Sequence, residues 1–367
     1  MIGPKAVIHL DRLIENYDQI KKKLQVSHLM VVVKANAYGH GSVECAKALE
    51  EHGCESFAVF SITEGIELRD AGIKGDILIF SKLNHSFLDL AIKHNITLNI
   101  SNLDDLDIVK RFSKQHNTSP RFHVKFDTGM TRLGLNVDEA EKAFEILYEN
   151  DELNYEGLYS HFATADEGDL SYAYEQTKKF KEILIKADSF GLNFKKIHFS
   201  NSGAVLNLNQ DDFNLVRVGM LVYGAYPSRE VPKDVSILPV MEFKAPIVEV
   251  RRVKKGTLIS YGGVYETEKE CNIGVVQCGF ADGIPRPWYK NGFIGYKGKQ
   301  YKIAGRICMD QFMVNFEDDL PGEGDEVLIF GSNDFNSILM ETIAEEIEST
   351  PYVIATGIKG RTKLLFS

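Results

Sequence analysis

The chain has 367 residues, with 42 Lys and Arg against 52 Asp and Glu, which gives a formal net charge of −10. At roughly 150 residues per domain, this length predicts two or three domains. Hydrophobic residues at 44% and charged residues at 26% are ordinary for a globular protein, and they exclude a disordered tail, a collagen-like repeat and a disulfide scaffold. An acidic chain with dispersed charges is a poor candidate for nucleic-acid binding, which depends on clustered cations.

The N-terminal segment carries charged residues where a secretory signal needs an apolar core. No stretch reaches the roughly 18 apolar residues of a membrane span. The five cysteines include no pair with the two-residue gap of a zinc or redox motif. We therefore expect a soluble, cytoplasmic protein with reduced thiols, which binds a small molecule rather than a metal, a membrane or a nucleic acid.

Residues up to about 225 alternate between short apolar runs and longer amphipathic stretches. The runs are rich in Val, Ile, Leu and Phe, as is typical of strands buried on both faces, and the stretches between them have helical spacing. Eight such runs fit either a TIM barrel or a doubly wound sheet, and the count favours the barrel. The runs are Leu29–Val33, Ser56–Phe60, Asp76–Phe80, Thr97–Ile100, Arg121–Phe126, Glu156–Ser160, Lys196–Phe199 and Leu215–Val218.

After Pro227 the sequence changes character, and further prolines from Pro232 onward mark a linker. Short β-type segments then recur, separated by turns rich in Gly and Asp. Residues Ser337–Glu348 are expected to form a short helix. The predicted fold is therefore an α/β TIM barrel over residues 1–228, followed by a mostly β C-terminal domain over residues 229–367.

Chemistry in a TIM barrel gathers at the C-terminal ends of the strands, so the residues directly after each run are the candidates. Lys34 ends a Val-rich run, where desolvation would free its amine as a nucleophile, although a lone lysine more often extends to solvent. Arg132 lies on a Gly-bounded loop that could hold an anion, and His161 is either functional or a satisfied core histidine. Ser202, which could cap the next helix, and Gly219 follow the last two runs, where barrels commonly bind phosphate.

Five motifs occur in order along the chain. They are Val33–Gly41 (VKANAYGHG), Lys125–Gly134 (KFDTGMTRLG), Ser260–Gly263 (SYGG), Gly279–Gly283 (GFADG) and Cys308–Gln311 (CMDQ). Together they closely resemble the alanine racemase family over essentially the whole chain and in both predicted domains. One lysine motif would also fit other pyridoxal phosphate barrels, whereas five ordered motifs would not.

The resemblance implies a homodimeric isomerase that interconverts L- and D-alanine and supplies D-alanine for peptidoglycan. The reaction is a two-base transfer of the Cα proton on a pyridoxal 5′-phosphate aldimine, and it needs opposed groups because the proton leaves one face and returns to the other. Lys34 would bond to the cofactor and act as one base. Tyr261 would be the other base and would arrive from the partner subunit; without the resemblance it would be interpreted as an exposed turn residue.

The resemblance also assigns roles to the positions around the cofactor. Arg217, contacted by His161, would face the pyridine nitrogen and keep it unprotonated, because a guanidinium does not give up its charge. Arg132 and the backbone of Met309 would bind the substrate carboxylate, and Lys125 matches a lysine that is carbamylated in some members. The implied cofactor-binding positions are Lys34, Tyr38, Arg132, His161, Asn201, Ser202, Arg217, Gly219 and Tyr352.

Some positions depart from the family pattern. Phe280 stands where many relatives carry Tyr, and the tail after Tyr352 is a loose match, which concerns the entrance and the substrate preference more than the chemistry. Cys308 is either a reactive thiol or a buried structural one.

The alternative functions to an alanine racemase are a racemase of serine or lysine, a basic amino-acid decarboxylase and a non-catalytic pyridoxal phosphate carrier. A tyrosine base in a Ser-Tyr-Gly-Gly turn disfavours the decarboxylase, and the β domain disfavours the carrier.

Overall fold

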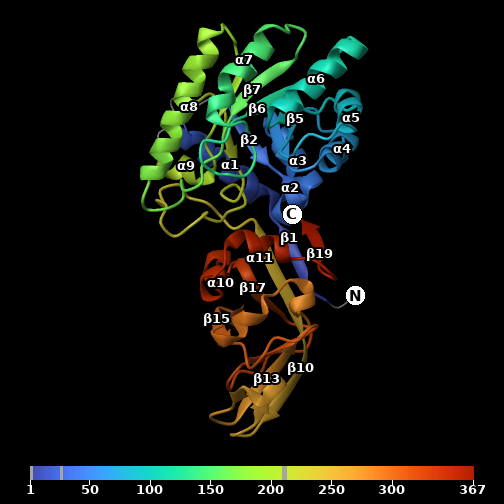
Figure 1. Ribbon diagram of the computed structural model, residues 1–367. Coiled ribbons are helices and arrows are strands. Elements are labelled where there is room, and N and C mark those ends of the chain that lie inside the picture. Colours follow the sequence, from blue (N-terminus) through green and yellow to red (C-terminus); the bar gives the residue numbers. More distant parts are fainter. Residues whose placement is uncertain (1–2, 25–27, 209–212) are drawn as a thin grey trace.

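The computed structural model describes residues 3–24, 28–208 and 213–367. Figure 1 shows an elongated molecule, with a helix-covered barrel at one end and a β-rich region at the other. The long strand β10 (Met241–Val253) runs from between the two regions into the β-rich one. Within the described ranges, no helix combines the length and the apolar character that crossing a membrane requires.

In the described part of the chain, eight short parallel strands form the barrel. They pair as two four-stranded sheets, in the orders β4-β3-β2-β9 and β5-β6-β7-β8. Parallel bridges from Leu78 to Thr97 and from His198 to Leu215 join the two sheets, so the predicted barrel is confirmed over the doubly wound alternative. The strands are β2 (Leu29–Val32), β3 (Ser56–Val59), β4 (Asp76–Ile79), β5 (Leu98–Ile100), β6 (Phe122–Lys125), β7 (Tyr155–Tyr159), β8 (Lys196–His198) and β9 (Val216–Val218).

Helices cover the outside of the barrel (Figure 1). Local signals begin several of them: the Ser61 side chain caps α4 in a capping box with Glu64, and the Asn102 side chain caps α6 by accepting from the Asp105 N–H. The helices of this region are α1 (Leu10–Leu24), α2 (Lys34–Tyr38), α3 (Ser42–Glu51), α4 (Ile62–Asp70), α5 (Phe87–Lys93), α6 (Leu103–His116), α7 (Ala140–Tyr148), α8 (Ser171–Ser189) and α9 (Ser202–Asn207).

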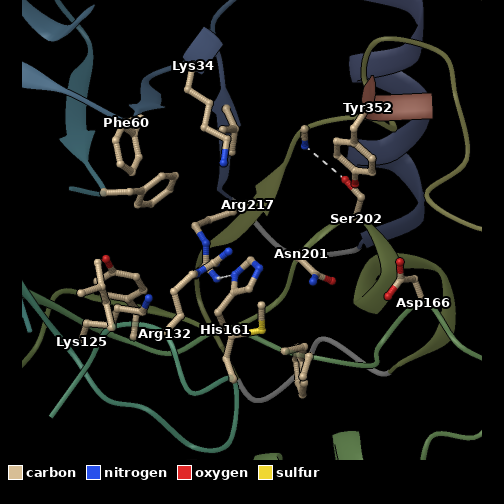
Figure 2. Close-up of a pocket in the computed structure, with 18 of the residues that line it drawn as sticks. Lys34, Phe60, Lys125, Arg132, His161, Asp166, Asn201, Ser202, Arg217 and Tyr352 are labelled. Atoms are coloured by element: carbon tan, nitrogen blue, oxygen red, sulfur yellow. Dashed lines mark hydrogen bonds between the residues drawn. The ribbon is translucent and has the colours of Figure 1, made fainter. Parts of the chain in front are cut away.

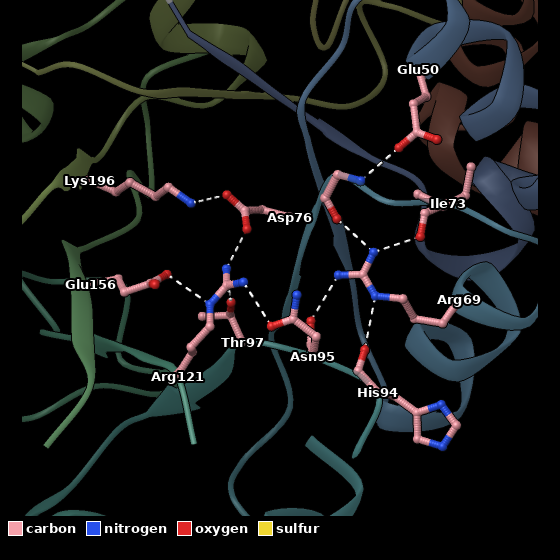
Figure 3. Close-up of polar contacts among 11 residues, drawn as sticks. Glu50, Arg69, Ile73, Asp76, His94, Asn95, Thr97, Arg121, Glu156 and Lys196 are labelled. Atoms are coloured by element: carbon pink, nitrogen blue, oxygen red, sulfur yellow. Dashed lines mark hydrogen bonds and ion pairs between the residues drawn. The ribbon is translucent and has the colours of Figure 1, made fainter. Parts of the chain in front are cut away.

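Ion pairs join the N-terminal ends of several barrel strands (Figure 3). Asp76, which begins β4, pairs with both Arg121, just before β6, and Lys196, which begins β8. The Arg121 Nε lies 3.1 Å from a carboxylate oxygen of Glu156 on β7. Arg69 of α4 donates to backbone carbonyls of the neighbouring loops. Since Arg121, Lys196 and Arg69 all have polar partners within the protein, we interpret this end of the barrel as structural.

The region after the barrel is mostly β, as expected, but its sheet also includes the first strand of the chain. Strand β1 (Lys5–Ile8) pairs antiparallel with β10 and parallel with β19 (Lys363–Phe366). The predicted division at residues 228 and 229 does not anticipate this pairing. Burial in β1 alternates along the strand, which suits a sheet with two different faces, whereas barrel strands such as β2 are buried throughout.

The end of the chain differs from the prediction. Residues Ser337–Glu348 do not form one helix, because Ser337 and Ile338 pair with β17 and only the following residues are helical. The remaining elements of this region are β11 (Leu258–Ile259), β12 (Tyr265–Glu266), β13 (Cys271–Val276), β14 (Phe293–Tyr296), β15 (Lys299–Lys302), β16 (Phe312–Asn315), β17 (Glu326–Ser332), β18 (Ser337–Ile338), α10 (Met340–Glu346) and α11 (Pro351–Gly357).

Candidate active site

A cavity of about 410 Å³ lies at the C-terminal ends of the barrel strands (Figure 2). We call it the barrel pocket. Its lining combines cationic, hydroxyl-bearing and aromatic side chains, and it brings together most of the residues that the sequence singled out. Those residues are Lys34, Tyr38, Lys125, Arg132, His161, Asn201, Ser202, Arg217, Gly219 and Tyr352.

Lys34 enters the pocket from the start of α2, which is a left-handed turn and not a regular α-helix. Residues 35–38 have φ angles between 51° and 54°, and the turn ends at Gly39 with φ 85°. The left-handed region costs about 1–2 kcal/mol for each L residue other than glycine. A Cβ on Gly39 would lie 2.5 Å from the Ala355 carbonyl oxygen, so this turn also packs tightly against α11. Such strain persists only where the surroundings enforce it, and it is concentrated at functional sites, so the segment after Lys34 is a candidate functional segment.

The pocket holds more positive than negative charge. Burial lowers the pKa of Lys34, and Arg132 and Arg217 lower it further, while Glu64 opposes them. Burial, Arg132 and Arg217 lower the pKa of Lys125 to about 8. A cation-rich, desolvated pocket favours an anionic ligand, and it disfavours the protonated form of each lysine amine.

Arg217 on β9 is the centre of a buried hydrogen-bond network. Its Nη1 donates to His198 Nδ1 at 2.7 Å, and its Nη2 donates to His161 Nδ1 at 3.1 Å and to the Ser160 carbonyl at 2.8 Å. Because a guanidinium only donates, both ring nitrogens must accept, which requires neutral imidazoles. Burial and Arg217 lower the pKa of both histidines well below the usual range. Burial lowers the pKa of Arg217 to about 10, so the arginine stays cationic at neutral pH.

The opposite end of the pocket presents hydroxyl groups. The Gly219 N–H donates to Ser202 Oγ at 3.1 Å, and a Cβ on Gly219 would lie 2.7 Å from the Tyr38 hydroxyl. The expectation that Ser202 caps the next helix is wrong, because Asn201 Oδ1 accepts from the Ala204 N–H at 3.0 Å and so caps α9 itself. The Ser202 hydroxyl therefore lines the pocket beside a glycine with no side chain.

Sequence reasoning missed several lining residues. The centroid of the Phe80 ring lies 6.0 Å from Lys34 Nζ, and the centroid of the Tyr159 ring lies 5.7 Å from Lys125 Nζ. Both aromatic residues fall near the C-terminal ends of predicted strands, where candidate site residues were sought. They were not singled out because aromatic residues in apolar runs usually pack in the core. Asp166 lines the pocket from the loop after β7, and burial raises its pKa. Nothing in its sequence surroundings singled it out.

Tyr261 and Met309 do not line the barrel pocket. They are 66% and 56% exposed in the C-terminal region, and Phe280 beside them is 38% exposed. The Ser260 hydroxyl donates to the Arg306 carbonyl at 2.7 Å, and the Phe280 N–H donates to the Cys308 carbonyl at 3.1 Å, so the three C-terminal motifs meet in one exposed region. The Cys308 thiol is half-buried here and not fully buried, and the other four cysteines are buried free thiols.

Two family models match the chain in the same order as its two regions. Residues 8–227 match the N-terminal domain of alanine racemase, and residues 240–366 match its C-terminal domain. The chain belongs to the alanine racemase family. The resemblance inferred from the five motifs is confirmed.

Individual members of the alanine racemase family match over their full lengths. Alanine racemase 2 of Caldanaerobacter subterraneus subsp. tengcongensis is 36% identical, over 100% of this chain and 95% of that protein. The solved alanine racemase of Clostridium difficile 630 is 35% identical with a TM-score of 0.92, over 100% of this chain and 96% of that one. The alanine racemase of Bartonella henselae, solved with covalently bound pyridoxal phosphate, shares the fold at 24% identity and a TM-score of 0.90, over 100% of both chains.

Proposed function

We propose that this chain is an alanine racemase, a pyridoxal phosphate-dependent isomerase that interconverts L- and D-alanine. The observation that carries the proposal is the convergence of Lys34, Arg132 and Arg217 on one cavity in a chain that matches both domains of the family. A cytoplasmic location and a role in supplying peptidoglycan precursors stay predictions from the sequence.

The barrel pocket fits pyridoxal 5′-phosphate. Lys34 has an amine of lowered pKa that could bond covalently to the aldehyde of the cofactor. The space over Gly219, which a Cβ would fill, and the hydroxyls of Tyr38, Ser202 and Tyr352 suit a phosphate group. When bound, the cofactor would withdraw electrons from the substrate Cα and make its proton acidic.

The chain's own groups would then handle the substrate and the proton. Arg132 would hold the substrate carboxylate, and Lys34 Nζ would take or return the Cα proton on one face. Arg217 would donate to the pyridine nitrogen, and its network with His161 and His198 holds it in place. Because this arginine cannot hand over a proton, the ring nitrogen would stay neutral, which limits side reactions such as transamination.

A second copy of the chain would complete the site. Racemisation needs a base on each face, and Lys34 can serve only one of the two faces. Tyr261 is proposed as the second base, and the Met309 backbone as a further contact for the substrate carboxylate. Both are exposed and outside the pocket of their own chain, which supports a homodimer with shared sites.

Lys125 is proposed as a carbamylation site. Its pKa of about 8 leaves a substantial neutral fraction of amine near neutral pH, and only the neutral amine reacts with carbon dioxide. The reaction forms an N–C bond as one C=O π bond of carbon dioxide breaks, and the nitrogen releases one proton to solvent. The resulting carbamate would be an anion among the cations Arg132 and Arg217, which also lower the pKa of the free lysine.

The deciding experiment is an assay of the purified, cofactor-loaded chain on L-alanine and on D-alanine. Interconversion of the enantiomers is the expected result, with serine and lysine as parallel substrates. Faster racemisation of serine or lysine would show that alanine is not the preferred substrate. Release of carbon dioxide without racemisation would overturn the proposal in favour of a decarboxylase.

A further inference from the structure

Glu64, in the first turn of α4, reaches from outside the barrel pocket to the turn that carries Lys34. We propose that Glu64 is a positioning residue, which anchors the left-handed turn and supplies a negative charge that balances the cations around Lys34. This inference rests on the proposed function, since it assigns Glu64 a role through the lysine of that site.

The Glu64 carboxylate accepts hydrogen bonds from two separate segments. Its Oε1 accepts from the Ala35 N–H at 2.7 Å. Its Oε2 accepts from the Phe60 N–H at 2.8 Å, from the Ser61 N–H at 2.9 Å and from the Ser61 hydroxyl at 3.3 Å. A capping box needs only the bond to the N-cap residue, here Ser61. The bond to Ala35 is therefore additional, and it ties the end of β2 to the end of β3.

The bond to Ala35 falls where the backbone is most in need of support. Ala35 follows Lys34 directly and is the first of four successive left-handed residues, none of them glycine. Farther along the turn, His40 Nδ1 lies 3.0 Å from the Ala37 carbonyl, and Asn36 Oδ1 accepts from the Ser42 N–H at 2.9 Å. Side chains thus hold both ends of the turn, and Glu64 holds the end next to the lysine.

The charge of Glu64 also matters, because the surroundings of Lys34 are otherwise cationic. Arg132 and Arg217 disfavour the protonated lysine, whereas Glu64 favours it. Removing this carboxylate would therefore take away a negative charge that favours the protonated lysine. Among the described residues, the ionisable groups that interact electrostatically with Lys34 include Glu64, Lys125, Arg132, His161 and Arg217.

The test compares Glu64→Gln with Glu67→Gln. Glu67 is an exposed residue of the same helix, so the control makes the same chemical change away from the turn. The full-length chain, freed of cofactor, is pulsed with an amine-acylating reagent over a range of pH, and labelling of the Lys34 peptide is quantified by mass spectrometry. We expect Glu64→Gln to lower the pKa of Lys34 by half a unit or more, which is about a threefold rise in labelling at a fixed pH below that pKa. Glu67→Gln should leave it unchanged.

Kinetics of the cofactor-loaded enzyme test the anchoring role separately. We expect Glu64→Gln to reduce kcat about tenfold or more with little change in KM, because a displaced lysine affects proton transfer more than substrate binding. Glu64→Asp keeps the charge on a shorter side chain, so it should restore the pKa of Lys34 but not the full kcat. Thermal unfolding of each variant gives the folded fraction.

Two outcomes would overturn the inference. Identical Lys34 labelling and kcat in Glu64→Gln and Glu67→Gln would remove any role for Glu64. A loss of kcat that only follows the folded fraction, with the pKa of Lys34 unchanged, would reduce Glu64 to a helix cap. If the wild-type chain did not racemise alanine, the proposed function would fail, but the labelling experiment would still test the link between Glu64 and Lys34.

Discussion

The barrel and the C-terminal β region treat their candidate functional residues in opposite ways. In the barrel, Lys125 and Arg217 are 6% and 3% exposed, and burial is the largest cause of their lowered pKa values. In the β region, Tyr261 and Met309 are mostly exposed. The barrel therefore changes the pKa values of its charged groups by removing water from them. The β region exposes Tyr261 and Met309, which would act only when another subunit packs against them.

The strongest test of the barrel half is Lys34→Ala. This change should reduce racemisation of alanine by about a thousandfold or more, because it removes both the covalent hold on the cofactor and one base. The rate is measured by following the enantiomers on a chiral column. Lys47→Ala, at an exposed position of α3, is the matched control and should stay near the wild-type rate. Comparable losses in both variants would contradict the assignment.

Tyr261→Phe tests whether the exposed Tyr261 of the C-terminal β region is the second base. We expect a loss of about 10²–10⁴-fold in Cα proton exchange from one enantiomer in deuterated water and a much smaller loss from the other, since only one face loses its base. Equal losses from both enantiomers would argue against opposed bases.

Mixing Lys34→Ala with Tyr261→Ala subunits tests whether the two halves come from different chains. Mixed dimers would contain one site with both wild-type residues, so partial activity should return in proportion to the mixed fraction. Subunit exchange is confirmed with two affinity tags. No recovery in confirmed mixed dimers would place the two residues in the same chain.

Desolvation of Lys125 predicts that the stability of the barrel depends on pH. Its folded-state pKa of about 8 is below the usual value of about 10.4, so between these pH values the unfolded chain binds more protons and stability rises with pH. The rise is about 3 kcal/mol for the full shift. Urea unfolding of the cofactor-free chain in buffer free of carbon dioxide measures it, and Lys125→Met should lack this part of the rise. Parallel curves for the two proteins would refute it.

Gly219→Ala probes the barrel pocket with the smallest change. The new Cβ would lie 2.7 Å from the Tyr38 hydroxyl, so Tyr38 must shift. We expect affinity for pyridoxal phosphate to fall about tenfold, or about 1.4 kcal/mol, as measured by absorbance titration. Gly3→Ala, where a Cβ would meet nothing within 4 Å, is the control. Unchanged affinity would show that this end of the pocket is not crowded by the ligand.

The sequence predicted the barrel well because its strands are buried on both faces and read as continuous apolar runs. The search for residues directly after each run singled out Lys34, Ser202 and Gly219, and the structure brings all three to one pocket. Arg217 lies inside the run Leu215–Val218, and only the family resemblance pointed to it. The sequence did not predict that β1 pairs with strands of the C-terminal sheet, because the residues of a four-residue strand do not specify which strand it pairs with. Nor could it show that Glu64 reaches Ala35, since that contact joins the ends of two strands.

The pairing of β1 with β19 makes the assembly of the molecule depend on its order of synthesis. At about 5–20 residues per second, a ribosome needs roughly 20–70 s to pass from the first of these strands to the last. Until β19 is made, β1 can pair on one side only, with β10, so Ala6 and Ile8, which are both buried in the finished sheet, lack their neighbours on the β19 side. The barrel lies between the two strands in the sequence, so its segments are all made before that sheet can be completed. The half that carries Tyr261 and Met309 is therefore finished last.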